Sequence, residues 1–209
     1  MKLFKTSLIF LLLVLILWGL LVLFTPKDDK VFHVIIDPGH GGKDPGAVVG
    51  DVYEKNINLA ISLLVRDNLS EYENIKISMT REDDSYISLG ERVELANKIQ
   101  ADIFVSIHAN ALEDLSYSGL FTFYPPNKPS SKKIAELIQS AVSSSTGAIN
   151  RGVRSDSFYV LSKTDMPAVL IETGFMTCPE ELILLTDREY QIKLANGISD
   201  GILSAVSGQ

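Results

Sequence analysis

The feature that most constrains the fold of this chain is an alternation of short apolar runs with longer amphipathic stretches. The apolar runs predict strands at 31–37, 75–79, 102–107, 120–124, 158–161 and 168–171. In the amphipathic stretches apolar residues recur every three or four positions, which predicts helices at 55–69, from 88, near 134–141 and from 186. Strands that alternate with helices predict a single α/β domain, with a mostly parallel central sheet flanked by helices.

Three short patterns predict where helices begin. Each has Ser or Thr followed three residues later by Glu, the spacing of a capping box. They are Ser88 with Glu91, Thr177 with Glu180, and Thr186 with Glu189.

An uncharged run at 8–24 predicts a membrane segment, because about 17–20 apolar residues can cross the hydrocarbon core. Lys2 and Lys5 precede the run, which favours a cytoplasmic N-terminus, and no small-residue cleavage site follows it. We expect a cytoplasmic stub at 1–6, a transmembrane signal anchor at 7–25, a short linker at 26–30 and an extracytoplasmic catalytic domain at 31–209. A cleaved signal peptide, which would release a secreted domain, is the alternative.

Composition excludes two classes of protein. The net charge of −7 argues against a nucleic-acid partner, because neutralising phosphates requires clustered Lys and Arg. A single Cys excludes an intramolecular disulfide framework and any Cys-rich zinc finger.

Side chains that can do chemistry follow three of the predicted strands. His40 lies in a Gly-rich loop after the first strand, His108 and Glu172 directly follow two others, and Glu54 starts the first helix. Sites in such sheets form beyond the carboxyl ends of the strands. Two imidazoles and one carboxylate leave a tetrahedral Zn²⁺ one open position, and a second carboxylate can move a proton, which is enough for amide hydrolysis. On the pattern alone, buried structural histidines are an equal alternative.

Several separate motifs resemble one family of enzymes. In chain order they are Ile36-Asp-Pro-Gly-His-Gly-Gly42, Tyr53-Glu-Lys-Asn56, Met79-Thr-Arg81, Ser106-Ile-His-Ala-Asn110, Arg151-Gly-Val153, Tyr159-Val-Leu161 and Met166-Pro-Ala-Val-Leu-Ile-Glu-Thr-Gly-Phe175. Together they resemble the zinc-dependent N-acetylmuramoyl-L-alanine amidases of the amidase 3 type, over about 31–202. A membrane-anchored single domain is similar to the germination and sporulation amidases of spore formers.

The resemblance implies a role for each of the four residues. His40, Glu54 and His108 would bind one Zn²⁺ per chain, and Glu172 would be the general base and acid. The substrate would be peptidoglycan, cut at the amide between N-acetylmuramic acid and L-alanine of the stem peptide. Two alternatives are a catalytically silent peptidoglycan-binding module and a zinc peptidase that cuts within the stem peptide.

Other residues are candidates for supporting the site. Asp37 and Asn110 could accept a hydrogen bond from a ligating histidine, because such histidines usually need an acceptor for the other ring N–H. Arg81 and Arg92 match positions of the family, where a structural ion pair is favoured over substrate contact.

The sequence also bears on regulation. Some members of the family insert a blocking helix after the motif of 106–110, but 111–118 is too short to form one. We expect an open cleft in a monomer, for which an activator protein is possible but not required.

Overall fold

The computed structural model describes residues 30–207. The predicted stub, the anchor and all of the linker except Lys30 lie outside the described residues. Within 30–207, none of the helices is both long enough and apolar enough to span a bilayer.

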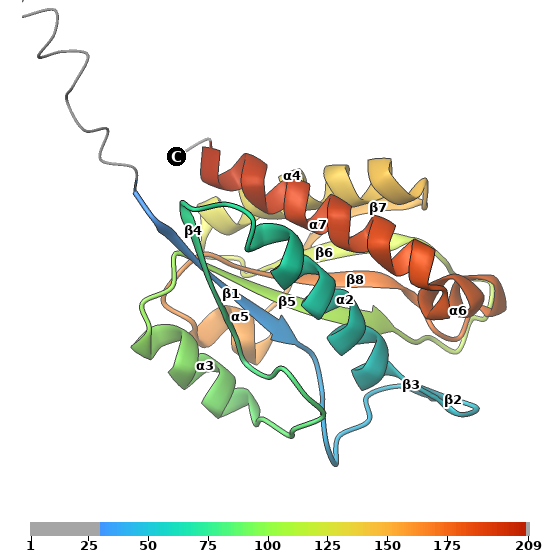
Figure 1. Ribbon diagram of the computed structural model, residues 1–209. Coiled ribbons are helices and arrows are strands. Elements are labelled where there is room, and N and C mark those ends of the chain that lie inside the picture. Colours follow the sequence, from blue (N-terminus) through green and yellow to red (C-terminus); the bar gives the residue numbers. More distant parts are fainter. Residues whose placement is uncertain (1–29, 208–209) are drawn as a thin grey trace, which may run out of the picture. The chain divides into compact units, whose positions relative to one another are not determined.

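A six-stranded sheet forms the centre of the domain (Figure 1). Its strands are β1 (Phe32–Pro38), β4 (Ile75–Met79), β5 (Ile103–Asn110), β6 (Leu120–Tyr124), β7 (Asn150–Ser155) and β8 (Ala168–Phe175), and their order is β4-β1-β5-β8-β6-β7. Strand β6 runs antiparallel to β8, and every other neighbouring pair is parallel. A small hairpin of β2 (Val48–Val49) and β3 (Val52–Tyr53) precedes the first helix. The predicted α/β domain with a mostly parallel sheet is confirmed.

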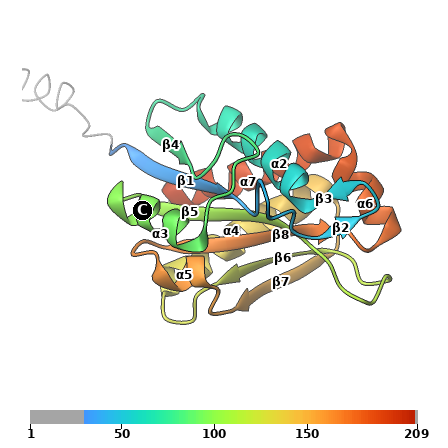
Figure 2. The same cartoon turned by 90° about the horizontal axis from the view of Figure 1, so that it is seen from below.

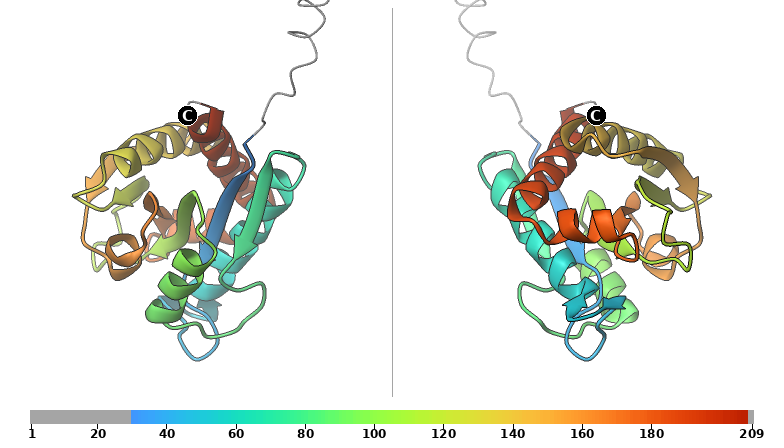
Figure 3. Two further views of the ribbon diagram at one scale, coloured as in Figure 1. Left: turned by 90° about the vertical axis from the view of Figure 1, so that its left-hand side faces the viewer. Right: turned by 90° about the vertical axis from the view of Figure 1, so that its right-hand side faces the viewer.

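Helices cover both faces of the sheet, as the two views in Figure 3 show. One face carries α2 (Glu54–Leu69), α4 (Pro129–Thr146) and α7 (Arg188–Ser207), and the other carries α3 (Leu89–Lys98) and α5 (Tyr159–Lys163). The short helix α6 (Pro179–Thr186) follows β8 and packs on α7. The sheet has a hydrophobic core on each face, and alternate residues of a strand point into one or the other. In β5, Val105 and Ile107 lie in the larger core, and Phe104 lies in the smaller one with residues of α3 and α5.

Two predictions about local structure are wrong. The expected strand at 158–161 is the helix α5, a single short turn that packs Val160 and Leu161 against the sheet. Strand β7 was not predicted, because its sequence Asn-Arg-Gly-Val-Arg-Ser has no apolar alternation, as an exposed edge strand permits.

Two of the three predicted capping boxes are also wrong. Thr177 lies outside α6, and its hydroxyl accepts a hydrogen bond from the backbone N–H of Leu112. At the start of α7 the cap is Asp187 rather than Thr186, since the Asp187 carboxylate accepts from the backbone N–H of Tyr190. Thr186 instead turns back to the carbonyls of α6.

The capping box at Ser88 is confirmed and yields a stability prediction. The Ser88 hydroxyl accepts from the backbone N–H of Glu91, whose carboxylate accepts from the backbone N–H of Ser88. We expect Ser88→Ala to lower the free energy of unfolding by about 1 kcal/mol in urea denaturation, because the backbone N–H of Glu91 loses its acceptor. Ser144→Ala, at an exposed position inside α4, is the control and should not destabilise. Equal stability of the two variants would contradict the prediction.

Candidate metal centre and catalytic cleft

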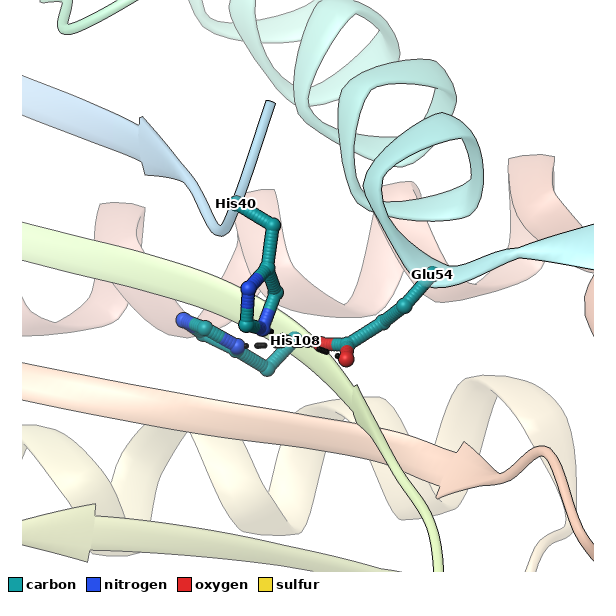
Figure 4. A group of neighbouring side chains, drawn as sticks. All are labelled: His40, Glu54 and His108. Carbon is teal, nitrogen blue, oxygen red and sulfur yellow. Dashed lines mark hydrogen bonds and ion pairs between the residues drawn. The ribbon is translucent and has the colours of Figure 1, made fainter. Parts of the chain in front are cut away.

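Three candidate metal ligands meet at the carboxyl ends of β1 and β5, beside the start of α2 (Figure 4). His40 lies in the loop after β1, Glu54 is the first residue of α2, and His108 lies near the end of β5. Each offers a ligand atom, and these atoms all lie within 4.8 Å of one another. The structure therefore brings together side chains that are 68 positions apart at most in the sequence (108 − 40).

The fourth candidate, Glu172, lies beside His108 for a reason of strand register. Glu172 on β8 pairs with His108 on β5, so both side chains project from the same face of the sheet. The Glu172 side chain is buried, with 8% of the residue exposed, and its Oε2 atom has no hydrogen-bond partner among residues 30–207. It lines the same cleft as His40 and His108. A buried carboxylate oxygen without a partner is costly, which marks this atom as one that awaits a ligand.

His40 is held in place by its backbone and by Asp44. Its φ of 62° is left-handed, an uncommon conformation outside glycine. The ring Nδ1 lies 2.9 Å from Asp44 Oδ2, and the ring Nε2 lies 3.2 Å from Glu54 Oε2. The Asp44 carboxylate also accepts a hydrogen bond from the backbone N–H of Gly46. This second bond orients the carboxylate that contacts the His40 ring.

Glu54 is buried and fully engaged. Its Oε1 lies 3.0 Å from His108 Nδ1 and accepts from Asn58 Nδ2 at 3.0 Å, while its Oε2 accepts from the backbone N–H of Ala47 at 2.9 Å. Burial alone would raise the pKa of Glu54, but the hydrogen bonds and charges of His108 and His40 outweigh it and hold that pKa far below its ordinary value. Glu54 is therefore an ionised carboxylate, as a metal ligand must be.

The electrostatics of the cluster favour a cation. Burial lowers the pKa of His40, but hydrogen bonds and charge from Glu54 and Asp44 raise it to about 9. Without a metal, His40 is therefore protonated at neutral pH, and its positive charge is stabilised by the carboxylates of Glu54 and Asp44. Two imidazoles and one carboxylate match the donor set of a catalytic zinc site, which keeps a fourth position open. The residues present therefore fit Zn²⁺.

The absence of a side chain at Gly39 provides the space that the His108 ring occupies. A Cβ atom built at this position would lie 2.3 Å from His108 Cε1 and 2.4 Å from its Nε2. We expect Gly39→Ala to displace the ring and to weaken Zn²⁺ binding roughly 10- to 100-fold, the range found when the support of a ligand is removed. Competition with a fluorescent zinc chelator measures this affinity.

The matched control for Gly39→Ala is Gly90→Ala, within α3, where an added Cβ meets nothing within 4 Å. That variant should bind Zn²⁺ normally and gain about 0.5–1 kcal/mol of stability from better helix propensity. Unchanged zinc affinity in Gly39→Ala would show that the ring has another position from which to bind.

Within residues 30–207, the proposed acceptors Asp37 and Asn110 accept no hydrogen bond from His40 or His108, and this part of the sequence interpretation is corrected. The Asp37 carboxylate is bound by Arg92, Thr80 and Ser106. Asn110 Oδ1 accepts from the backbone N–H of Ala111. The residue that supports His40 is Asp44, four positions along the same loop.

Arg81 and Arg92 brace the loop that carries His40. Arg92 forms the expected ion pair with Asp37 and donates to the carbonyls of Pro38 and His40. For Arg81 the expected ion pair is wrong: in the part of the chain that the structure describes, its guanidinium donates to four backbone carbonyls. These belong to Pro38, Gly39, Lys55 and Asp83. Arg81 thereby ties the His40 loop to the start of α2.

The cleft has a volume of about 310 Å³, and its lining includes His40, His108 and Glu172. The segment 111–118 contains no helix, and none of its residues lines this cleft. The cleft is therefore not covered by the segment that follows β5.

An α/β domain with a His–Glu–His cluster at the ends of its strands, next to a buried carboxylate with one unpartnered oxygen, has the organisation expected of a metal-dependent hydrolase. The family model described as N-acetylmuramoyl-L-alanine amidase matches residues 34–204, so the chain belongs to this family. The predicted family and enzyme type are confirmed.

Relatives and solved structures agree with the family. The germination-specific N-acetylmuramoyl-L-alanine amidase of Bacillus subtilis is 34% identical over 193 residues, covering 85% of this chain and 80% of that protein. An N-acetylmuramoyl-L-alanine amidase from Clostridium difficile 630 superposes with a TM-score of 0.84 at 39% identity, covering 86% of this chain and 99% of that one. The CwlD amidase from Clostridioides difficile, solved in complex with the GerS lipoprotein, superposes with a TM-score of 0.82 at 38% identity, covering 85% and 100%.

Proposed function

We propose that this chain is a zinc-dependent peptidoglycan hydrolase that cleaves the amide between N-acetylmuramic acid and L-alanine of the stem peptide. The observation that carries the proposal is the cluster of His40, Glu54 and His108 beside the unpartnered Oε2 of Glu172. Membership of the amidase family supports the choice of bond.

The roles of the side chains follow from their positions. His40, Glu54 and His108 would hold Zn²⁺, which supplies Lewis acidity and lowers the pKa of a water molecule. Burial raises the pKa of Glu172 to about 7, an effect that the charge of His108 reduces and that of Glu54 reinforces. This value belongs to the metal-free chain, and the charge of a bound Zn²⁺ would lower it, so that Glu172 could accept the proton of the attacking water at neutral pH and return it to the leaving nitrogen. The hydrogen bond between Asp44 and His40 Nδ1 orients the ring with Nε2 on the side of Glu54.

The test is the zinc-dependent release of stem peptides from purified peptidoglycan. Protein stripped with a chelator should be inactive and should recover with added Zn²⁺, and mass spectrometry should find free L-alanine amines and intact muramoyl acids. Cuts between amino acids would identify a zinc peptidase instead. Binding to peptidoglycan without release, by folded and zinc-loaded protein, would identify a silent binding module.

We further propose that the domain is anchored at the outer face of the cell membrane by residues 7–25. The apolar run at 8–24, preceded by Lys2 and Lys5, supports this proposal. Membrane fractionation of cells that express the full chain, followed by protease treatment of intact protoplasts, tests it. A soluble chain in the medium, shortened at its N-terminus, would favour a cleaved signal peptide.

We propose that the enzyme is active without a protein partner, because segment 111–118 leaves the cleft uncovered. The complex of the CwlD amidase with the GerS lipoprotein shows that a member of this structural group does bind a partner. Strict dependence of the purified enzyme on an added protein would contradict the proposal.

A further inference from the structure

Four exposed apolar side chains gather along one side of the catalytic cleft. Tyr86, Leu89, Phe158 and Tyr159 all line it, with 43%, 56%, 38% and 48% of each residue exposed. We call these four residues the apolar wall. Leu89 and Tyr159 are the first residues of α3 and α5, and Tyr86 and Phe158 lie just before these helices, which contact each other on the same face of the sheet (Figure 2). Large apolar side chains left exposed together mark a binding surface.

The apolar wall is built on a rigid base. The Phe158 ring packs edge-on against Phe123, with ring centres 5.0 Å apart, and Phe123 packs in the same way against the buried Phe121. The capping box at Ser88 fixes the start of α3 between Tyr86 and Leu89. A surface that is already ordered loses little conformational entropy when it binds a ligand.

The charges around the cleft restrict what the wall can bind. Arg92 is the one cationic Lys or Arg side chain of the cleft lining in the described part of the chain, and its guanidinium is bound to Asp37 and to backbone carbonyls. Lys43 lies outside the lining, with its ammonium 4.3 Å from the centre of the Tyr86 ring. A stem peptide carries carboxylates, which are best recognised by Arg or Lys. Sugar rings present uncharged C–H faces, which match the apolar wall.

The size of the cleft also favours sugar rings of a glycan as the ligand of the apolar wall. A volume of about 310 Å³ is at the lower end of the range for small-molecule sites, so the cleft accommodates the groups around the scissile amide and little more. Further sugars of a polymer must lie along the exposed edge, where Leu89 and Tyr159 stand.

Resting on the proposed function, we propose that the apolar wall binds the glycan strand beside the cleaved muramoyl unit. The enzyme then selects polymeric peptidoglycan over an isolated muramoyl peptide. Tyr159 and Leu89 are positioning residues for this polymer and take no part in proton transfer.

The first experiment compares two substrates with the same stem peptide, using the full chain in detergent loaded with Zn²⁺. One substrate is a single muramoyl peptide, and the other is a glycan strand of several disaccharides. For Tyr159→Ala and Leu89→Ala we expect kcat/KM on the strand to fall about 3- to 10-fold, the scale of one lost aromatic or apolar contact, mainly through KM. On the single muramoyl peptide, which the same cleft must also hold, the loss in their kcat/KM should be clearly smaller than on the strand. Tyr72→Ala, an exposed tyrosine that does not line the cleft, is the matched control.

The second experiment separates this inference from the proposed function by measuring binding alone. Peptide-free glycan strands should bind the zinc-loaded chain, Tyr159→Ala should weaken that binding, and Tyr72→Ala should not. If the parent binds these strands but hydrolyses neither substrate, the proposed function fails and the glycan site stands. Equal losses on both substrates, no losses, or a Tyr159→Ala defect that disappears when the stem peptide is shortened would each overturn the glycan site.

Discussion

Glu172→Gln should abolish most of the amidase activity while leaving the metal centre intact. Glutamine has nearly the shape of glutamate but cannot accept the proton of the attacking water. Positioned acid–base groups contribute about 10²–10⁴-fold to rates, so we expect kcat to fall by that factor. Release of stem peptides from purified peptidoglycan, followed by mass spectrometry, gives the rate.

Two further measurements tell a lost proton carrier from a damaged site. Zinc affinity of Glu172→Gln should stay within a few-fold of the parent value, because Glu172 is not one of the three clustered ligands. The metal-free variant should also be no less stable than the parent at pH 8. Burial raises the pKa of Glu172 from 4.5 to about 7, so an ionised carboxylate at pH 8 costs the fold stability that a neutral amide does not. Activity within tenfold of the parent would remove Glu172 from the mechanism.

The main elements of the site were predictable because strand ends are predictable. His40, His108 and Glu172 each follow an apolar run, and neighbouring parallel strands end at the same edge of a sheet. Period-two alternation then places His108 and Glu172 on one face once their strands pair in register. Such reasoning needs only local patterns and one rule of topology.

The support of the site was not predictable in the same way. Asp44 reaches His40 because the loop turns back through a left-handed residue, and no periodic pattern reports that turn. A carboxylate four residues after a candidate ligand in a Gly-rich loop was the available signal. Arg81 was expected to pair with an acid, but the sequence does not reveal that its partners are backbone carbonyls.

The predictions for strand β7 and helix α5 were wrong because tertiary contacts, rather than the local sequence, determine these two elements. The β7 sequence is polar and lies at an edge, where pairing with β6 on one side suffices. Residues 158–161 are apolar enough for a strand, but in the structure Val160 and Leu161 are buried in the smaller core as part of one helical turn. Short apolar runs are ambiguous between these two outcomes.

Removing one partner of the buried ion pair between Asp37 and Arg92 should destabilise the fold strongly. Arg92 Nη1 lies 2.6 Å from Asp37 Oδ1, with the two side chains 3% and 1% exposed. Asp37→Asn leaves the guanidinium buried without a counter-charge, which costs about 3–5 kcal/mol. For a domain of this size, that loss corresponds to a Tm lower by roughly 6–20 °C in a thermal melt. The matched control is Glu82→Gln, which breaks the exposed pair with Arg66 and should change stability by less than about 1 kcal/mol.

The pH dependence of this difference tests its electrostatic origin. Burial alone would raise the pKa of Asp37, but the charge of Arg92 and the hydrogen bonds from Thr80 and Ser106 lower it below its ordinary 3.8. A carboxyl group whose pKa is lower in the folded state stabilises the fold above its unfolded pKa, and that contribution is lost as the pH falls through the folded value. The gap between the parent and Asp37→Asn should therefore be constant from about pH 8 to pH 5 and should narrow below about pH 4. A gap that stays the same down to pH 2 would mean that Asp37 stabilises the loop by its shape and hydrogen bonds rather than by its charge.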